Sequence, residues 1–354
     1  MSLVQLRVPP ADPGPGGGPL VDSQARTVRY LRVSLTDRCN YRCTYCMPQR
    51  PIEYGPRSAV LSLEEVGRLC EAFAQWGVER VRLTGGEPTL RRGLVDLVRR
   101  LSAIPTAQGT LEVVMTTNGE RLEALAEPLA RAGLRSLTVS LDSLDPARFT
   151  QITRRGDLSR VTAGLDAARA AGLAPIKLNV VALDGFNDEE LPQIVRWAWS
   201  RDIVPRFIEL MPMASGELFV PGELMLAAQI RARVAEGLGI ALQSDDGAGV
   251  AGAGPATYWR AVGGAFDGRR LGTIAAMTEN FCQSCNRLRV SATGQLHACL
   301  ARDDTGDLRS ALRSKDPDRL EHVVRTVLGT KRDAHGFNMD GSGGPTKAMV
   351  SIGG

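Results

Sequence analysis

Short apolar runs rich in β-branched residues alternate with longer amphipathic runs over residues 29–210, and this alternation restricts the fold more than any other feature of the chain. Runs of the first kind predict strands and runs of the second kind predict helices. Because a closed TIM barrel has eight strand-helix units and this chain shows six, we expect an α/β protein with an incomplete (β/α)6 TIM-like barrel, open laterally. The expected strands are Tyr30–Leu35, Val78–Thr84, Leu111–Thr117, Ser136–Asp142, Ile176–Leu183 and Val204–Met211.

The amphipathic runs between these strands predict helices, two of which have a recognisable start. Residues 62–65 and 187–190 both carry the pattern of a capping box. Cys70 falls on the apolar face of the first of these helices, so we expect it to be a core residue. The other expected helices cover residues 91–101, 121–132 with a bend at Pro128, 158–171 and 221–236.

Both ends of the predicted barrel adjoin segments of a different composition. Residues 1–25 contain a Pro- and Gly-rich stretch and no basic start followed by an apolar run, which predicts a flexible tail and no secretory signal. The Gly- and Ala-rich residues 244–255 predict a linker. We therefore expect a barrel over residues 26–243 and a smaller C-terminal region over residues 244–354.

Composition limits the compartment and the partners. No run approaches the roughly 20 apolar residues that a bilayer-spanning helix needs. The formal charge of +4 is spread along the chain, so charge alone indicates neither a nucleic-acid nor a membrane partner. Six of the seven cysteines fall into two groups of three, which indicates metal binding in a reducing cytoplasm and not a disulfide scaffold.

The first group, which we call the first triplet, is Cys39, Cys43 and Cys46. A 4Fe-4S cluster has four irons, and each needs one ligand from outside the cluster. Three cysteine thiolates therefore leave one iron open to a small molecule. Structural zinc needs four ligands, and no fourth cysteine or histidine lies nearby. The spacing therefore favours an iron-sulfur cluster that takes part in chemistry over a zinc site.

Basic residues interrupt four of the expected strands, although a parallel sheet covered on both faces is usually apolar throughout. Each could pair with an acid such as Glu209 or Asp142, or extend to a strand end. Taken together, the four basic residues indicate a polyanionic ligand inside the barrel as strongly as they indicate these separate arrangements. The four residues are Arg32, Arg82, Lys177 and Arg206.

Polar segments follow three strands at the end where barrel enzymes keep their active sites. In Thr84-Gly-Gly-Glu-Pro88 the glycines let the backbone approach a ligand closely, and Glu87 supplies an acceptor for an ammonium group. Thr116-Thr-Asn-Gly119 and Ser140-Leu-Asp-Ser143 end two further strands with hydroxyls and amides, which could bind a ligand or simply cap the next helix.

The second triplet is Cys282, Cys285 and Cys299. It could hold a second cluster with an open iron, or zinc with His297 as the fourth ligand. Arg287 and Arg289 lie two residues apart, so both project from one face of an extended segment. Paired guanidiniums of this kind suit phosphate oxygens.

These motifs resemble a known family. The first triplet, with Tyr45 before its last cysteine, is similar to the signature of the radical S-adenosylmethionine (SAM) superfamily. The order of the motifs narrows the resemblance to the GTP 3',8-cyclase family of molybdenum cofactor biosynthesis, over about residues 26–354. They are Thr84-Gly-Gly-Glu-Pro88, Thr116-Thr-Asn-Gly119, Arg206-Phe-Ile-Glu-Leu-Met211, Phe281 to Arg289 and the terminal Gly353-Gly354.

The resemblance implies a lyase with two 4Fe-4S clusters, the first on Cys39, Cys43 and Cys46 with SAM, and the second on Cys282, Cys285 and Cys299 with the guanine of GTP. It implies that a 5'-deoxyadenosyl radical abstracts the ribose 3' hydrogen. The implied SAM contacts are Tyr45, Gly86, Glu87, Ser140 and Met211. The implied GTP contacts are Arg32, Arg82, Thr116, Lys177, Arg206, Arg287 and Arg289, the last two being the implied catalytic residues.

Further expectations follow from the same resemblance. The terminal glycines should enter the barrel near the arginines, where any side chain would clash. The partners implied are a reductant protein and a downstream cyclic pyranopterin monophosphate synthase, with room for a homodimer and with neither nucleic acid nor membrane. The alternatives are another two-cluster radical SAM enzyme that modifies a peptide, and a zinc protein that binds nucleic acid.

Overall fold

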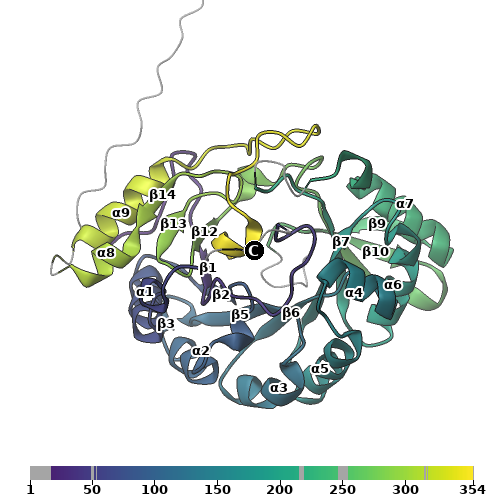
Figure 1. Cartoon of the computed structure of the whole chain (residues 1–354), viewed down its shortest axis with the longest axis horizontal. Coiled ribbons are helices and arrows are strands. Elements are labelled where there is room, and N and C mark those ends of the chain that lie inside the picture. The colour runs from purple at the N-terminus through teal and green to yellow at the C-terminus, as the bar shows by residue number, and fades with distance from the viewer. Residues whose placement is uncertain are drawn as a thin grey trace, which may run out of the picture.

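A 12-stranded sheet curves into an open barrel in the computed structural model, which describes residues 17–48, 52, 54–214, 219–245, 254–314, 316 and 318–353. Helices line its outside and the C-terminus lies at its centre (Figure 1). The strands are β1 (Tyr30–Ser34), β2 (Arg80–Thr84), β5 (Glu112–Thr117), β6 (Ser136–Ser140), β7 (Ile176–Ala182), β8 (Val204–Glu209), β9 (Ala241–Asp245), β10 (Thr257–Val262), β11 (Arg270–Ile274), β12 (Arg287–Val290), β13 (Gln295–His297) and β14 (Thr305–Asp307), with a separate hairpin of β3 (Pro105–Thr106) and β4 (Gly109–Thr110).

The middle of the sheet is parallel, in the order β12-β1-β2-β5-β6-β7-β8-β11. Antiparallel neighbours extend it with β13 and β14 at one edge and with β10 and β9 at the other. The two outermost strands are not paired with each other, so the predicted incomplete, laterally open barrel is confirmed. All six predicted strands form, and each differs from its predicted range by one or two residues at one end.

Strands from the predicted C-terminal region belong to the same sheet as the barrel. β12 pairs with β1 and β11 pairs with β8, so the segment after the predicted linker completes both sides of the parallel core. Residues 246–253 of that linker lie outside the described residues. Strands from both sides of residue 244 are therefore hydrogen-bonded in one sheet. The division into two domains at this residue stays a prediction.

The helices cover the outer face of the sheet (Figure 1). They are α1 (Leu63–Gln75), α2 (Leu94–Ser102), α3 (Leu122–Arg131), α4 (Pro146–Thr153), α5 (Leu158–Ala170), α6 (Leu191–Trp199), α7 (Ala227–Leu238), α8 (Leu308–Arg313) and α9 (Asp318–Gly329). No helix in the described part of the chain is long and apolar enough to cross a bilayer. Pro128 lies inside α3, as expected, and Cys70 is fully buried in the core.

One predicted capping box is confirmed and the other is wrong. Ser62 Oγ accepts a hydrogen bond from Glu65 N at 3.1 Å, and the Glu65 carboxylate accepts one from Ser62 N at 2.8 Å. At the second position, residues 188–190 form a 3-10 turn and α6 begins only at Leu191. The Asn187 side chain caps no helix, because it accepts from Leu183 N and donates to Asp142 O, both at 2.8 Å.

Two other helix predictions need correction, and one helix was missed. α2 begins three residues later than expected, because Gly93 before it has a positive φ of 79°. α7 begins at Ala227, since residues 221–223 form a separate 3-10 turn. α4 was not predicted, although Pro146 at its first position and the Asp145 side chain, which accepts from Arg148 N, mark its start.

Basic strand residues are accommodated because the two faces of the barrel differ. Leu31 and Val33 of β1 are fully buried in the apolar core with the helices. Arg32 between them has Arg289 of β12 and Arg82 of β2 as its neighbours in register, and such neighbours share a face of the sheet. The inner face of the barrel is therefore polar and cationic, and the outer face carries the core.

Part of the predicted N-terminal tail belongs to the folded chain, which corrects the expected range of 1–25; residues 1–16 lie outside the described residues. Leu20 is fully buried, and its backbone N donates to Trp76 O at 3.2 Å. The Asp22 carboxylate forms an ion pair with Arg26 at 2.6 Å.

Replacing Leu20 by Ala tests this correction, with Val21→Ala as the matched control. Leu20 is fully buried and Val21 is 49% exposed. We expect Leu20→Ala to lower the free energy of unfolding by about 2–5 kcal/mol and Val21→Ala by less than about 0.5 kcal/mol, measured by chemical denaturation. Equal effects of the two substitutions would show that this segment does not pack into the core.

Candidate active site

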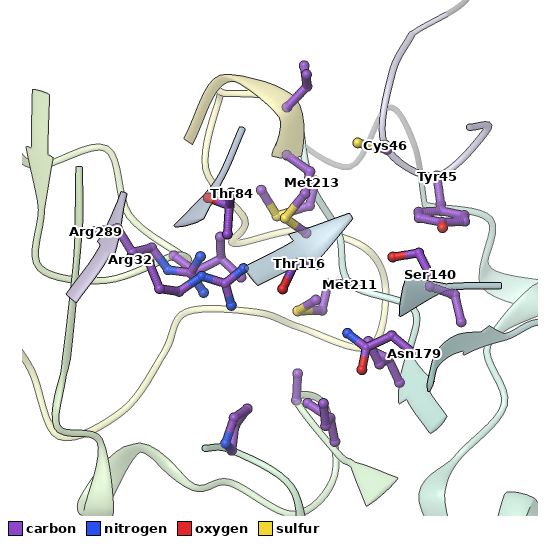
Figure 2. Close-up of a pocket in the computed structure, with 18 of the residues that line it drawn as sticks. Arg32, Tyr45, Cys46, Thr84, Thr116, Ser140, Asn179, Met211, Met213 and Arg289 are labelled. Atoms are coloured by element: carbon purple, nitrogen blue, oxygen red, sulfur yellow. The ribbon is translucent and has the colours of Figure 1, made fainter. Parts of the chain in front are cut away.

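Both cysteine triplets line one cavity inside the barrel. In Figure 2, Arg32 and Arg289 lie on one side of this cavity and Tyr45, Cys46 and Ser140 on the opposite side. Most of the residues predicted for the site meet here. Those that line the cavity are Arg32, Cys39, Cys43, Tyr45, Cys46, Gly86, Glu87, Thr116, Ser140, Met211, Cys282, Cys285, Arg287, Arg289 and Cys299.

The glycines after β2 are required by the loop of the first triplet. Gly86 N donates to Thr36 O at 2.6 Å, and Glu87 N donates to Arg38 O at 2.8 Å. A Cβ on Gly86 would lie 2.3 Å from Arg38 O, which no side chain can tolerate. We expected the glycines to admit a ligand; in the structure they first of all admit the backbone that carries Cys39.

Glu87 holds the ends of β2 and β5 together. Its side chain is 1% exposed, and its Oε1 accepts from Thr89 N at 3.0 Å and from the hydroxyls of Thr89 and Thr117 at 2.6 Å. Its Oε2 accepts from Asn118 N at 2.8 Å. Burial raises the pKa of Glu87 in spite of these bonds. Only Oε2 keeps capacity for a further donor, such as an ammonium group.

Asp142 positions Tyr45 beside the first triplet. The Tyr45 hydroxyl donates to Asp142 Oδ2 at 2.8 Å, and Val181 N donates to Asp142 Oδ1 at 2.8 Å. Burial raises the pKa of Asp142 to about 6. The sequence offered Asp142 as one possible partner for a strand cation and as part of the polar Ser140-Leu-Asp-Ser143 segment; in the structure its two carboxylate oxygens accept from Tyr45 and Val181.

The first triplet lies among neutral donors and acids. Cys39 Sγ accepts from Tyr41 N at 3.4 Å and lies 4.0 Å from the Asn118 amide nitrogen. Burial, and next the charge of Glu87, raise the pKa of Cys39 to about 12. Burial, and next Cys39, raise the pKa of Cys46 to about 12. Thiolates here need a positive metal centre, and N–H donors to sulfur are typical of cluster ligands, so the residues fit a 4Fe-4S cluster.

The second triplet lies among cations. Cys285 Sγ accepts from Arg287 Nη2 at 3.6 Å and from Lys331 Nζ at 3.4 Å. Burial alone would raise the pKa of Cys285, but Arg287 and Lys331 lower it to about 6. Cys299 Sγ accepts from Ala301 N at 3.4 Å. These thiolates also fit a metal cluster, in surroundings of the opposite charge to those of the first triplet.

His297 does not join the second triplet as a fourth ligand. Its side chain is 1% exposed on β13 opposite Arg289, and it is not among the residues that line the cavity. Nowhere in the described part of the chain do three or more His, Cys, Asp or Glu side chains converge on one metal ion. A four-iron cube holds its thiolates at separate corners, so the two triplets are compatible with clusters, and His297 does not complete a zinc site with the second one.

A pair of arginines faces the cavity beside the second triplet. Arg289 is 8% exposed, and its Nη1 is buried without a hydrogen-bond partner in the described residues. Burial, and next repulsion by Arg287, lower the pKa of Arg289 to about 10. Buried guanidiniums in such a position are stabilised by an anion, which fits phosphate oxygens.

Three of the predicted ligand contacts do not line the cavity, because they lie beneath it. Arg82 Nη1 donates to Thr116 Oγ1 at 2.9 Å and to Thr138 Oγ1 at 3.0 Å. Arg206 Nη2 donates to Asn179 Oδ1 at 2.7 Å. Burial, and next Arg206, lower the pKa of Lys177 to about 7. Neither arginine contacts Glu209, whose carboxylate accepts instead from Ala227 N at 2.8 Å and Met277 N at 2.7 Å.

The C-terminal tail enters the barrel as expected (Figure 1). The Gly353 carbonyl accepts from the Thr84 hydroxyl at 3.1 Å and from Arg32 Nη2 at 3.3 Å. The backbone of Gly353 is in the left-handed region, with a φ of 74°, and a Cβ on this residue would lie 2.8 Å from Thr84 Oγ1. Gly354 lies outside the described residues.

Several cavity residues escaped the sequence analysis. Asn179 follows Lys177 by two residues on β7, so strand periodicity could have placed both on the inner face. Several other cavity residues carry no comparable signal, because they come from loops and from the C-terminal tail. They include Met213, His335, Phe337, Met349 and Val350.

Comparison with known proteins identifies two families along the chain. Residues 33–198 match the Radical SAM superfamily, and residues 203–337 match Molybdenum Cofactor Synthesis C. The fold is similar to that of Streptococcus suis SuiB bound to the precursor peptide SuiA, with a TM-score of 0.61 and 15% identity over 92% of this chain and 70% of that chain. At that identity the likeness concerns the fold alone.

Relatives at higher identity extend over nearly the whole chain. The GTP 3',8-cyclase of Nitrobacter winogradskyi is 44% identical over 326 residues, which make up 92% of each chain. That of Pseudomonas putida is 43% identical over 91% of this chain and 94% of the relative. Membership of the superfamily implies SAM and a 4Fe-4S cluster. The chain therefore belongs to the GTP 3',8-cyclase family of radical SAM enzymes.

Proposed function

We propose that this chain converts GTP to (8S)-3',8-cyclo-7,8-dihydroguanosine 5'-triphosphate in molybdenum cofactor biosynthesis. The observation that carries the proposal is a single cavity lined by two cysteine triplets and by Arg32, Arg287 and Arg289. The relatives named GTP 3',8-cyclase support the same reaction. The alternative is an enzyme that modifies a peptide. The similarity to SuiB does not support it, because that similarity concerns the fold alone. A peptide substrate would also not explain why three arginines line the cavity.

The first triplet is proposed to hold the cluster that binds SAM. Cys39, Cys43 and Cys46 leave one iron open, and the proposed SAM contacts are Tyr45, Gly86, Glu87, Ser140 and Met211. With both bound, the cluster and SAM would supply a 5'-deoxyadenosyl radical for removal of the ribose 3' hydrogen of GTP, so that the ribose carbon could join C8 of guanine. The chain itself orients the two ligands: Asp142 fixes Tyr45, and Glu87 fixes the strand ends around the cysteine loop.

A second 4Fe-4S cluster is proposed on Cys282, Cys285 and Cys299. Its open iron would take the guanine, because the triplet lines the same cavity as the first one. β12 runs on from Cys285 and carries Arg287 and Arg289, to which we assign triphosphate binding and a catalytic role. Guanine and triphosphate would then be held by one continuous segment.

The remaining proposed substrate residues act in two layers. Arg32 and Thr116 line the cavity and would contact GTP directly. Arg82 and Arg206 hydrogen-bond Thr116 and Asn179, which line it, so they would orient contact residues and add positive potential. Lys177 lies between them on β7 and adds to that potential. This revises the expectation that all of them touch GTP.

The reaction also requires partners that stay predictions. A reductant protein must supply one electron to the first cluster, and a cyclic pyranopterin monophosphate synthase would use the product. A cytoplasmic location and a homodimer are likewise predictions from the sequence.

Iron content tests the two-cluster proposal. Anaerobically reconstituted protein should hold about eight irons per chain, and removing Cys282, Cys285 and Cys299 together by substitution with Ala should leave about four. Cys70→Ala is the matched control, since Cys70 is buried in the core away from the cavity, and it should keep about eight. Four irons and one zinc in the unmodified protein would contradict the second cluster.

GTP affinity tests the role of the cavity arginines. Because hydrogen bonds to charged groups contribute about 1.5–3 kcal/mol, Arg289→Ala should weaken GTP binding by about 10- to 100-fold in calorimetry. Guanosine, which lacks the phosphates, should bind the variant and the unmodified protein alike. Arg99→Ala on the outer surface is the control and should change neither affinity. An equal loss for GTP and guanosine would place Arg289 away from the phosphates.

A further inference from the structure

Lys331 joins the two segments that carry the second triplet, one with Cys282 and Cys285 and the other with Cys299. It follows α9, its side chain is 4% exposed, and it does not line the cavity. Its Nζ donates to Ala298 O at 2.8 Å, to Arg287 O at 2.9 Å and to Cys285 Sγ at 3.4 Å. An ammonium group has three protons to donate, so these three contacts use all of them.

A buried ammonium is costly unless negative charge or full hydrogen bonding compensates it. None of the ion pairs among the described residues includes Lys331. Two of its partners are neutral carbonyls, and the third is the sulfur of Cys285. The thiolate of Cys285 is therefore the group whose negative charge this lysine compensates.

Among the described residues no cation donates to a sulfur of the first triplet; Arg154 donates there only to backbone carbonyls, Arg42 O at 3.2 Å and Met47 O at 3.3 Å. The donors to Cys39 Sγ are the backbone N of Tyr41 and the side-chain amide of Asn118, both neutral. A buried lysine is therefore not a general requirement for holding three cysteines in this fold. It distinguishes the second triplet from the first.

We propose that Lys331 is a positioning residue that makes the second cluster easier to reduce, an inference that rests on the proposed second cluster. Its bonds to Arg287 O and Ala298 O fix the segments on either side of the cluster, next to Cys285 and Cys299. Its positive charge against a ligand thiolate favours the reduced state, which carries one more electron, because net charge and hydrogen bonds to sulfur set cluster potentials.

The experiment uses the full chain with Cys39, Cys43 and Cys46 replaced by Ala, so that only the second triplet can hold iron. In this background we compare Lys331 with Lys331→Met in a redox titration followed by electron paramagnetic resonance. Reduction of the variant should be at least tenfold less favourable, a midpoint about 59 mV more negative for one electron. Arg332→Met removes the same charge from an exposed neighbouring position and should leave the midpoint unchanged.

Each outcome decides the proposal or its premise. An unchanged midpoint in Lys331→Met, or an equal shift in Arg332→Met, overturns the role of Lys331. If Lys331→Met folds but binds no iron, the titration uses Lys331→Gln, which keeps N–H donors but lacks the charge. A midpoint in Lys331→Gln equal to that of the protein with Lys331 also overturns the role of Lys331. A background protein that binds no iron refutes the second cluster of the proposed function and is thereby distinguished from failure of Lys331.

Discussion

Three guanidiniums stand in one row across neighbouring strands, Arg289 on β12, Arg32 on β1 and Arg82 on β2, and the rest of the site depends on this row. Like charges at neighbouring positions on one face of a sheet repel each other, so an anion between them stabilises the row. A fold that keeps such a row on its inner face is suited to an anion there. The row exists only because β12 returns to pair with β1, and this pairing also brings the second cysteine triplet into the cavity of the first.

Local features of the chain were predictable and long-range pairing was not. The six strands and the Ser62 capping box follow from residues close in sequence. The pairing of Arg32 with Arg289 joins positions 257 residues apart, which no local pattern encodes. The charges in the strands looked anomalous because we expected two apolar faces, whereas a barrel enclosing a ligand cavity has an outer apolar face and an inner polar one. The predicted helix cap at Asn187 was wrong because its side chain bonds the backbone of Leu183 and Asp142 and not the start of a helix.

Within the site, residue types were easier to predict than their roles. The cavity brings together both triplets, Arg287 and Arg289, as the motifs indicated. Glu87 was expected to bind an ammonium group, but its carboxylate accepts hydrogen bonds from Thr89, Thr117 and Asn118. Lys331 gave no signal in the sequence, because its role depends on contacts with two segments that are more than 30 residues away along the chain. Among the described residues the donors to Cys39 are neutral, whereas Arg287 and Lys331 donate to Cys285, so the sulfurs of the two triplets have electrostatically distinct neighbours.

The central claim is that SAM at the first triplet and GTP at the second react with each other inside one cavity. Its most direct test is to incubate the reduced, reconstituted protein with SAM and with GTP that carries deuterium at the ribose 3' carbon, and to measure the mass of the 5'-deoxyadenosine formed. The account predicts 5'-deoxyadenosine that carries one deuterium, together with a cyclised nucleotide. Unlabelled 5'-deoxyadenosine, formed without a nucleotide product, would contradict it.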